Sequence, residues 1–132
     1  MASIFKKEKK DAQKPVSQQT ARMSDLQELV GNDKETYDAL ASTMFLNPKN
    51  IDSSMKQAAE IAKKADVDGD RAKAGMRYHV AGGLAIYVGN VEKVVEYFGI
   101  AERLTGRHYG ILKNPEKAVA IAQEYYKKFL TT

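Results

Sequence analysis

The sequence predicts an all-α protein, and three observations support this class. From Ser24 onward, apolar side chains recur at the spacing that places them on one face of an α-helix. Short polar residues that cap helices, together with glycine and proline, separate these apolar stripes. No segment shows the pattern of a strand. The 132 residues, 43% hydrophobic and 29% charged, are enough for one folded domain.

The composition excludes several classes of protein. The chain has no cysteine, so we expect no disulfide, no cysteine-ligated zinc or iron–sulfur cluster and no thiol catalysis. The longest apolar run, Val80 to Val88, has nine residues and is too short to span a bilayer. Polar residues follow the first lysines, where a secretory signal would have an apolar segment. We therefore expect neither a transmembrane helix nor a signal peptide.

The net charge of +4 lies entirely in the first 22 residues. This segment holds six of the 21 basic and two of the 17 acidic side chains, which leaves fifteen of each in residues 23–132. The pattern predicts a basic arm, residues 1–22, ahead of a neutral domain. Its basic residues, the first candidates for phosphate contacts, are Lys6, Lys7, Lys9, Lys10, Lys14 and Arg22.

Residues 23–46 are predicted to form a helical extension. Ser24 or Asp25 can cap a short helix that Gly31 ends, and a second helix is expected from Asn32 or Asp33 to Leu46. In the second helix the apolar stripe consists of Tyr37, Leu40, Ala41, Met44 and Phe45. The Asn47-Pro48 pair is expected to stop it.

Four principal helices are predicted in residues 47–132. Asp52 or Ser53 is expected to cap the first, which has an alanine-rich stripe. The acidic segment Asp66–Asp70 resembles a calcium loop, but the positions that need Gly and Glu hold Arg71 and Arg77. We therefore predict an interhelical turn in which Asp70 caps the next helix.

The second of these helices, about 70–88, is unusual in its glycines. Interior glycine costs roughly 1 kcal/mol relative to alanine, so a compensating contact is expected. Small residues place nearly bare backbone on one side of the helix around Gly82. Tight packing inside the domain is the favoured explanation, and a contact between subunits is the alternative.

The last two helices follow clear starting signals. Asn90 is predicted to cap one helix, in which Gly99 could cause an interruption. A loop is expected over 105–113, and Asn114-Pro115 should begin the final helix.

Few residues point to catalysis. The two histidines, His79 and His108, lack a partner at metal-binding spacing, and the carboxylates are scattered on polar helix faces. His79 is expected to be a core or interface residue, and His108 a loop residue near phosphate or solvent. The sequence predicts a protein that is not an enzyme and that uses no cofactor, metal or small-molecule substrate.

A second basic cluster is predicted where the first two of the four helices meet. Its members are Lys63, Lys64, Arg71, Lys73 and Arg77. Solvated helix faces often carry such residues. The functional interpretation places this corner beside the arm, where it extends a track for nucleic-acid phosphates. An anionic membrane is the competing target, because Ile4 and Phe5 precede the lysines of the arm.

The basic arm, the cysteine-free helical domain and the length resemble the major coat proteins of filamentous and rod-shaped archaeal DNA viruses, the lipothrixviruses and rudiviruses. Local similarity covers about half of the chain. It consists of Tyr78, Gly82-Gly83-Leu84, Tyr109-Gly110-Ile111 and Pro115.

This resemblance implies an antiparallel four-helix bundle over residues 47–132 with an extended or helical basic arm. It implies a structural virion coat protein that wraps double-stranded DNA without sequence preference and pairs with itself or a related coat subunit in a helical filament. A lipid envelope around the filament is possible in the family. The expected location is the virion, with the host cytoplasm before assembly.

Two other functions stay open. A small cellular nucleoid-type or regulatory DNA-binding protein would share the basic arm, although no helix–turn–helix with base-reading residues stands out. A peripheral membrane or adaptor protein would share the amphipathic helices.

Overall fold

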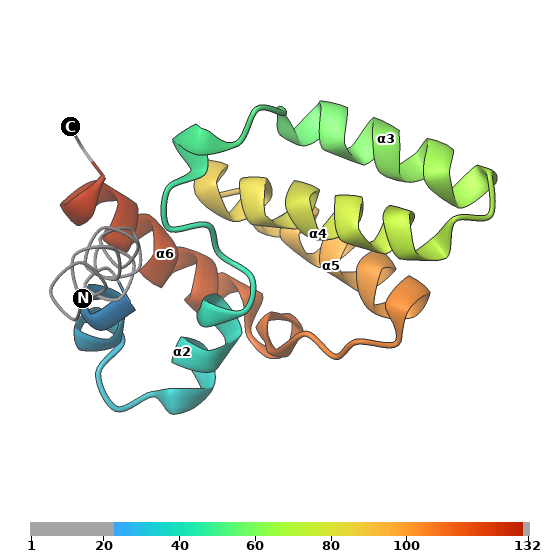
Figure 1. Cartoon of the computed structure of the whole chain (residues 1–132). Coiled ribbons are helices and arrows are strands. Elements are labelled where there is room, and N and C mark those ends of the chain that lie inside the picture. The colour runs from blue at the N-terminus through green and yellow to red at the C-terminus, as the bar shows by residue number, and fades with distance from the viewer. Residues whose placement is uncertain (1–22, 131–132) are drawn as a thin grey trace, which may run out of the picture.

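The computed structural model describes residues 23–130, which are helical with no strand, and the predicted all-α class is confirmed (Figure 1). Residues 23–30 are helical and lead into the remainder of the domain. The α-helices that follow are α2 (Lys34–Ala41), α3 (Met55–Val67), α4 (Arg71–Val88), α5 (Val91–Thr105) and α6 (Pro115–Phe129). Two short 3-10 helices, η1 (Pro48–Asn50) and η2 (Gly110–Lys113), lie in the connections.

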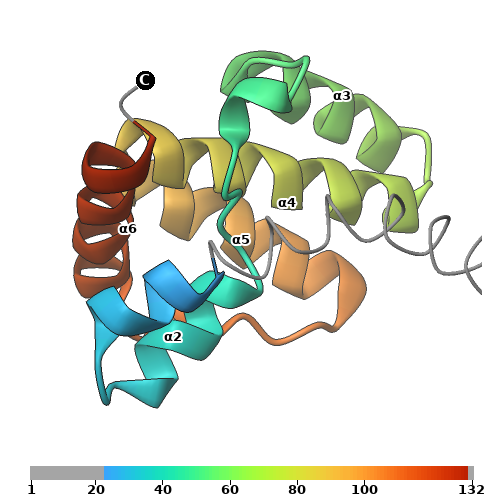
Figure 2. The same cartoon turned by 60° about the vertical axis from the view of Figure 1, so that its left-hand side comes forward.

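Helix α4 is the central element, with α3 and α5 packed on it. Gly75 of α4 faces Thr105 of α5 while Gly82 faces Phe98, so α4 and α5 run antiparallel. Helix α6 contacts α4, α5 and α2, and Figure 2 shows that it crosses the end of the α3–α4–α5 layer instead of running along it. The antiparallel four-helix bundle is therefore not confirmed by the described helices.

One apolar core joins all the described helices. The side chains of Leu26, Leu40, Phe98, Ile111 and Tyr125 are almost completely excluded from solvent and belong to the same cluster. The segment 23–46, predicted as an extension, thus contributes two of the most deeply buried leucines. Full burial of a leucine side chain stabilises a fold by about 1.5–3 kcal/mol, so this segment is part of the folded domain.

The helices begin at residues whose side chains accept hydrogen bonds from the first turn. The predicted caps Asp70, Asn90 and Asn114 are confirmed, and each accepts from the backbone N–H three residues later. The cap of α3 is Ser54 instead of Asp52 or Ser53. The side chain of Gln57 reaches back to the Ser54 N–H at 2.9 Å, which completes a capping box.

Helix α2 ends at Ala41, so the predicted extent to Leu46 is wrong. The hydroxyl of Thr43 donates to the Ala39 carbonyl at 2.6 Å, which gives that carbonyl a partner where the helix stops. The chain then turns to bring Phe45 onto α4, and the Tyr126 hydroxyl donates to the Phe45 carbonyl at 2.5 Å. The expected interruption of α5 is also absent, because this helix continues through Gly99.

The glycines of α4 lie where neighbouring chain segments approach most closely. A Cβ atom added to Gly82 would lie 2.6 Å from the ring of Phe98, and one added to Gly75 would overlap Thr105. At Gly83 it would overlap the ring of Phe45. The close contacts offset the cost of glycine in a helix, and the predicted internal packing at Gly82 is confirmed.

Substitution of Gly82 by leucine is expected to lower the free energy of unfolding by about 1–3 kcal/mol, because the new side chain overlaps Phe98. Thermal or urea unfolding followed by circular dichroism measures this change. The matched control is Gly99→Ala, in the interior of α5, where an added Cβ meets nothing within 4 Å. It should raise stability by up to about 1 kcal/mol. A Gly82→Leu protein as stable as the wild type would contradict the packing described.

Candidate nucleic-acid interface

The structure brings the five residues of the second basic cluster to the corner between α3 and α4. Lys63 and Lys64 lie in the last turns of α3, and Arg71, Lys73 and Arg77 lie in the first two turns of α4. All are exposed except Arg77, which is half-buried. Consecutive helical residues point about 100° apart, so Lys63 and Lys64 diverge and do not form a single flat patch.

Acidic residues reduce the charge of this corner. The turn between the helices holds Asp68 and Asp70, and Asp66 lies in the last turn of α3. Five basic and three acidic side chains leave a net charge of only +2. The corner can therefore contribute a few phosphate contacts but is not a strong anion-binding surface by itself.

Two arginines at the corner have unequal surroundings. The guanidinium Nη2 of Arg71 lies 3.5 Å from the Arg103 carbonyl near the end of α5, a long contact at an exposed site. The Nε of Arg77 is buried and has no hydrogen-bond partner among the described residues. Because this nitrogen is shielded from solvent, it is not available to an approaching anion, and Arg77 offers less to a phosphate than the exposed Arg71 and Lys73.

A further group of lysines, missed in the sequence interpretation, lies at the other end of the domain. Lys49 and Lys127 line a wide depression of about 840 Å³ with Tyr87 and Tyr126. Lys128 lies beside Lys127 in the last turn of α6. Adjacent lysines at the end of the final helix were the available signal, but only the fold brings Lys49 near them.

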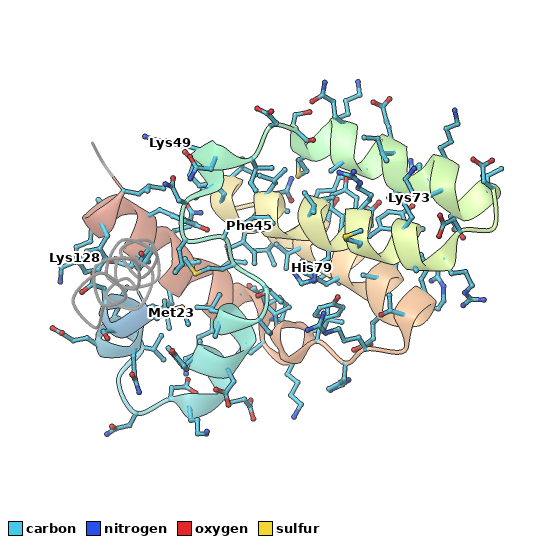
Figure 3. The ribbon with its side chains drawn as sticks, in the orientation of Figure 1. Met23, Phe45, Lys49, Lys73, His79 and Lys128 are labelled. Atoms are coloured by element: carbon cyan, nitrogen blue, oxygen red, sulfur yellow. The ribbon has the colours of Figure 1, made fainter. Side chains whose placement is uncertain are left out.

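The start of the described chain lies at this same end. The helical residues 23–30 pack against the end of α6, where Asp25 and Glu28 share a shallow pocket with Lys128. Figure 3 shows Met23 and Lys128 on one side of the molecule and Lys73 on the other. The corner thus does not adjoin the residue at which the described chain begins. The arm residues Lys6, Lys7, Lys9, Lys10, Lys14 and Arg22 lie outside the described residues.

The two histidines form structural contacts. The Nδ1 of His79 lies 2.9 Å from the Tyr109 hydroxyl, and the His79 ring packs edge-on against Phe98. Burial, reinforced by the positive charge of Arg107, lowers the pKa of His79. This contact links the segment before η2 to α4, as expected for a core histidine.

His108 belongs to a small network around Glu102. One oxygen of the Glu102 carboxylate lies 3.0 Å from the His108 Nδ1 and accepts the backbone N–H of Tyr109 at 2.9 Å. The network holds the loop that follows α5. Within residues 23–130 no group of three or more His, Asp or Glu side chains is placed to hold a metal ion, and no helix has the length and apolarity to cross a membrane.

Comparisons with known proteins give no relative. No protein-family model, no curated protein and no solved structure matches the chain. A functional proposal must therefore rest on the charges and contacts of this chain and on the resemblance described above.

The position of His79 predicts a specific pH dependence of stability. Because its pKa is lower in the folded than in the unfolded protein, the unfolded state binds more protons as the pH falls below about 6.5. The stabilisation from neutral His79 is complete above this pH and is lost as the pH drops toward the folded-state pKa. Melting temperatures measured between pH 7.5 and 5 should fall, and they should fall less in His79→Gln.

The control for this experiment is His108→Gln, because the side chain of His108 is 76% exposed. This variant should keep most of the pH dependence of the wild type. Equal pH dependence in His79→Gln and the wild type would show that neutral His79 is not the source.

Proposed function

We propose that this protein is a structural coat subunit that binds double-stranded DNA through residues 1–22 and assembles on it. The observation that carries the proposal is the separation of charge: the first 22 residues hold the entire net charge of +4, and the domain that follows is neutral. Lysines on such a segment each approach a phosphate and release a counterion, which gives binding that ignores sequence. The proposal assigns no catalysis to the chain.

The folded domain provides position and protein contacts in this proposal. The described chain begins near the end of α6, so the arm joins the domain beside Lys127 and Lys128. Asp25, Glu28 and Glu124 lie in the same region. The domain surface there is mixed in charge, and the main electrostatic attraction comes from the arm.

The corner between α3 and α4 is proposed as a secondary DNA contact. The exposed Arg71 and Lys73 support this role, because phosphates can approach their charged groups from solvent. The corner has a net charge of only +2, so it should contribute less to DNA affinity than the arm.

From the resemblance we also propose an antiparallel four-helix bundle with a basic arm, pairing of subunits in a helical filament, and a location in the virion. Support for the bundle comes from the antiparallel packing of α4 and α5 and from the short turn that reverses the chain between α3 and α4. Helix α6, which crosses the end of the α3–α4–α5 layer, is the helix that departs from the expected arrangement.

DNA binding is expected to depend strongly on salt and little on sequence. With about five or six arm charges on phosphates, the slope of log K against log salt should be roughly −4.5 to −5.5. Fluorescence anisotropy with duplexes of unrelated sequence, repeated over a range of salt, measures both properties. A slope near zero, or marked preference for one duplex, would remove the proposal.

Deletion of residues 1–22 separates the arm from the domain. Because no described core residue is removed, the truncated protein should keep its helical circular dichroism and its cooperative melting while it loses most DNA affinity. Lys73→Glu/Arg77→Gln in the full chain should weaken binding by a smaller factor. Anionic vesicles, offered in place of DNA, test the membrane alternative. Full DNA affinity in the truncated protein would transfer the binding site to the corner.

A further inference from the structure

An apolar groove runs beside the first half of α4. It has a volume of about 490 Å³, and Met76, Val80 and Phe45 form much of its wall. The Met76 side chain is 60% exposed although its neighbours are apolar. Exposed methionine next to other apolar side chains is typical of surfaces that adapt to a protein partner.

The charges at this groove are positive. Arg107 is the charged side chain in its lining, and no described lining residue is acidic. Lys73, which is exposed, precedes Met76 by three positions and so lies on the same side of α4. A partner that fits the groove should therefore combine apolar and acidic side chains.

The acidic counterpart lies in the same chain. Residues 23–46 contain five acidic side chains and one basic, a net charge of −4, whereas residues 47–132 carry fourteen basic and ten acidic side chains, a net charge of +4. Most of this positive excess lies outside the α3–α5 layer, because residues 55–105 carry eight basic and seven acidic side chains. The positive charge at the groove therefore comes from Lys73 and Arg107 themselves, and the acidic charge comes from the segment that contains α2.

Helix α2 presents this charge together with apolar surface. Glu35 and Asp38 are exposed, and the exposed Ala41 lies three positions after Asp38 on the same side of the helix. Tyr37 is half-buried and packs against the core of its own domain. Lys34 approaches Asp38 only at 3.8 Å on an open surface, a pair that contributes little to stability and is easily exchanged. Asp33 is different, because its carboxylate pairs with Lys117 and accepts from Thr36, and these contacts lower its pKa to about 2.

We infer that the groove beside α4 binds the exposed face of α2 from a second copy of this chain. Glu35 and Asp38 of one copy face Lys73 and Arg107 of the next, and the exposed Ala41 packs on the apolar wall of the groove at Met76. Residues 1–22 of the chain are a poorer occupant, because their net charge of +4 matches the sign of the groove. This inference rests on the assembly part of the proposed function and specifies the surfaces that meet.

The two surfaces are different parts of the domain, so the contact is heterologous. Each copy uses its groove for one neighbour and its α2 face for the other, which produces an open chain of copies unless the rotation closes a ring. Such a contact needs no DNA. It can therefore be tested separately from DNA binding.

The experiment uses two complementary charge-reversal variants of the full chain. The first, Glu35→Lys/Asp38→Lys, removes the acidic face and keeps the groove. The second, Lys73→Glu/Arg107→Glu, removes the groove charge and keeps the acidic face. Sedimentation equilibrium without DNA, at ionic strength well below about 0.1 M, gives the weight-average mass over a range of concentration.

The wild type should exceed twice the 14.7 kDa monomer mass and keep growing with concentration. Each variant alone should stay within a few per cent of the monomer mass. An equimolar mixture should reach twice the monomer mass and stop there, because one intact groove and one intact acidic face can still meet. Met76→Glu, a change at an exposed position of the groove, should also lower the mass of the wild-type assembly.

Matched controls carry the same charge changes at other exposed sites. Glu60→Lys/Glu116→Lys includes Glu116, which like Glu35 lies in the first turn of a helix, and Lys56→Glu/Lys113→Glu matches the groove variant. Both should assemble as the wild type does, and circular dichroism melts identify any variant that is unfolded.

A wild-type protein that stays monomeric across the concentration range would overturn the inference. Variants that assemble like the wild type, or a mixture that stays monomeric while the wild type grows, would also overturn it. In each of these cases the salt-dependent DNA binding of the arm can still be measured, so failure of the α2 contact is distinguishable from failure of the proposed function.

Discussion

The fold depends on how closely other segments approach the central helix α4. Gly75 and Gly82 lie seven residues apart on the side that faces α5, and Gly83 lies on the side that faces Phe45. Without Cβ atoms at these positions, the Phe98 ring lies directly on the helix backbone and the 43–45 segment can cross its other side. Because interior packing is dense, the contacts at these glycines determine where α5 and the 43–45 segment lie against α4. The glycines lower the helix propensity of α4, but their lack of a side chain permits this close packing.

Side chains that bond to backbone groups of distant segments hold the outer elements on this centre. The amide of Gln123 in α6 donates to the carbonyls of Ile86 and Tyr87 at 2.7 and 2.8 Å, which gives partners to carbonyls at the open end of α4. Tyr126 binds the Phe45 carbonyl one turn later on α6. Because Gln123 bonds to the last turn of α4, helix α6 must lie at that end of α4. It therefore crosses the layer instead of lying along it.

The residues that carry the net charge of the protein are not those that form its core. The core draws on residues from Leu26 to Tyr126, while the net positive charge lies before Met23. Within the domain, residues 23–46 have a net negative charge and residues 47–132 a net positive charge. Charged residues at the surface contribute little to stability, so they are free to serve association. A basic arm for phosphates, and acidic residues on α2 that match the basic residues beside the α4 groove, are the properties that a subunit binding both DNA and its own copies would use.

The sequence alone determined the helical class, the caps Asp70, Asn90 and Asn114, and the concentration of charge in residues 1–22, because periodicity, capping and charge are local properties. It also located the basic corner and the aspartates between its two groups of basic residues, because these lie close together in the chain. The end of α2 at Ala41, the partner of each α4 glycine, the crossing of α6 and the approach of Lys49 to Lys127 were decided only by the tertiary structure. These features depend on contacts between residues far apart in the chain, for which local pattern carries no information.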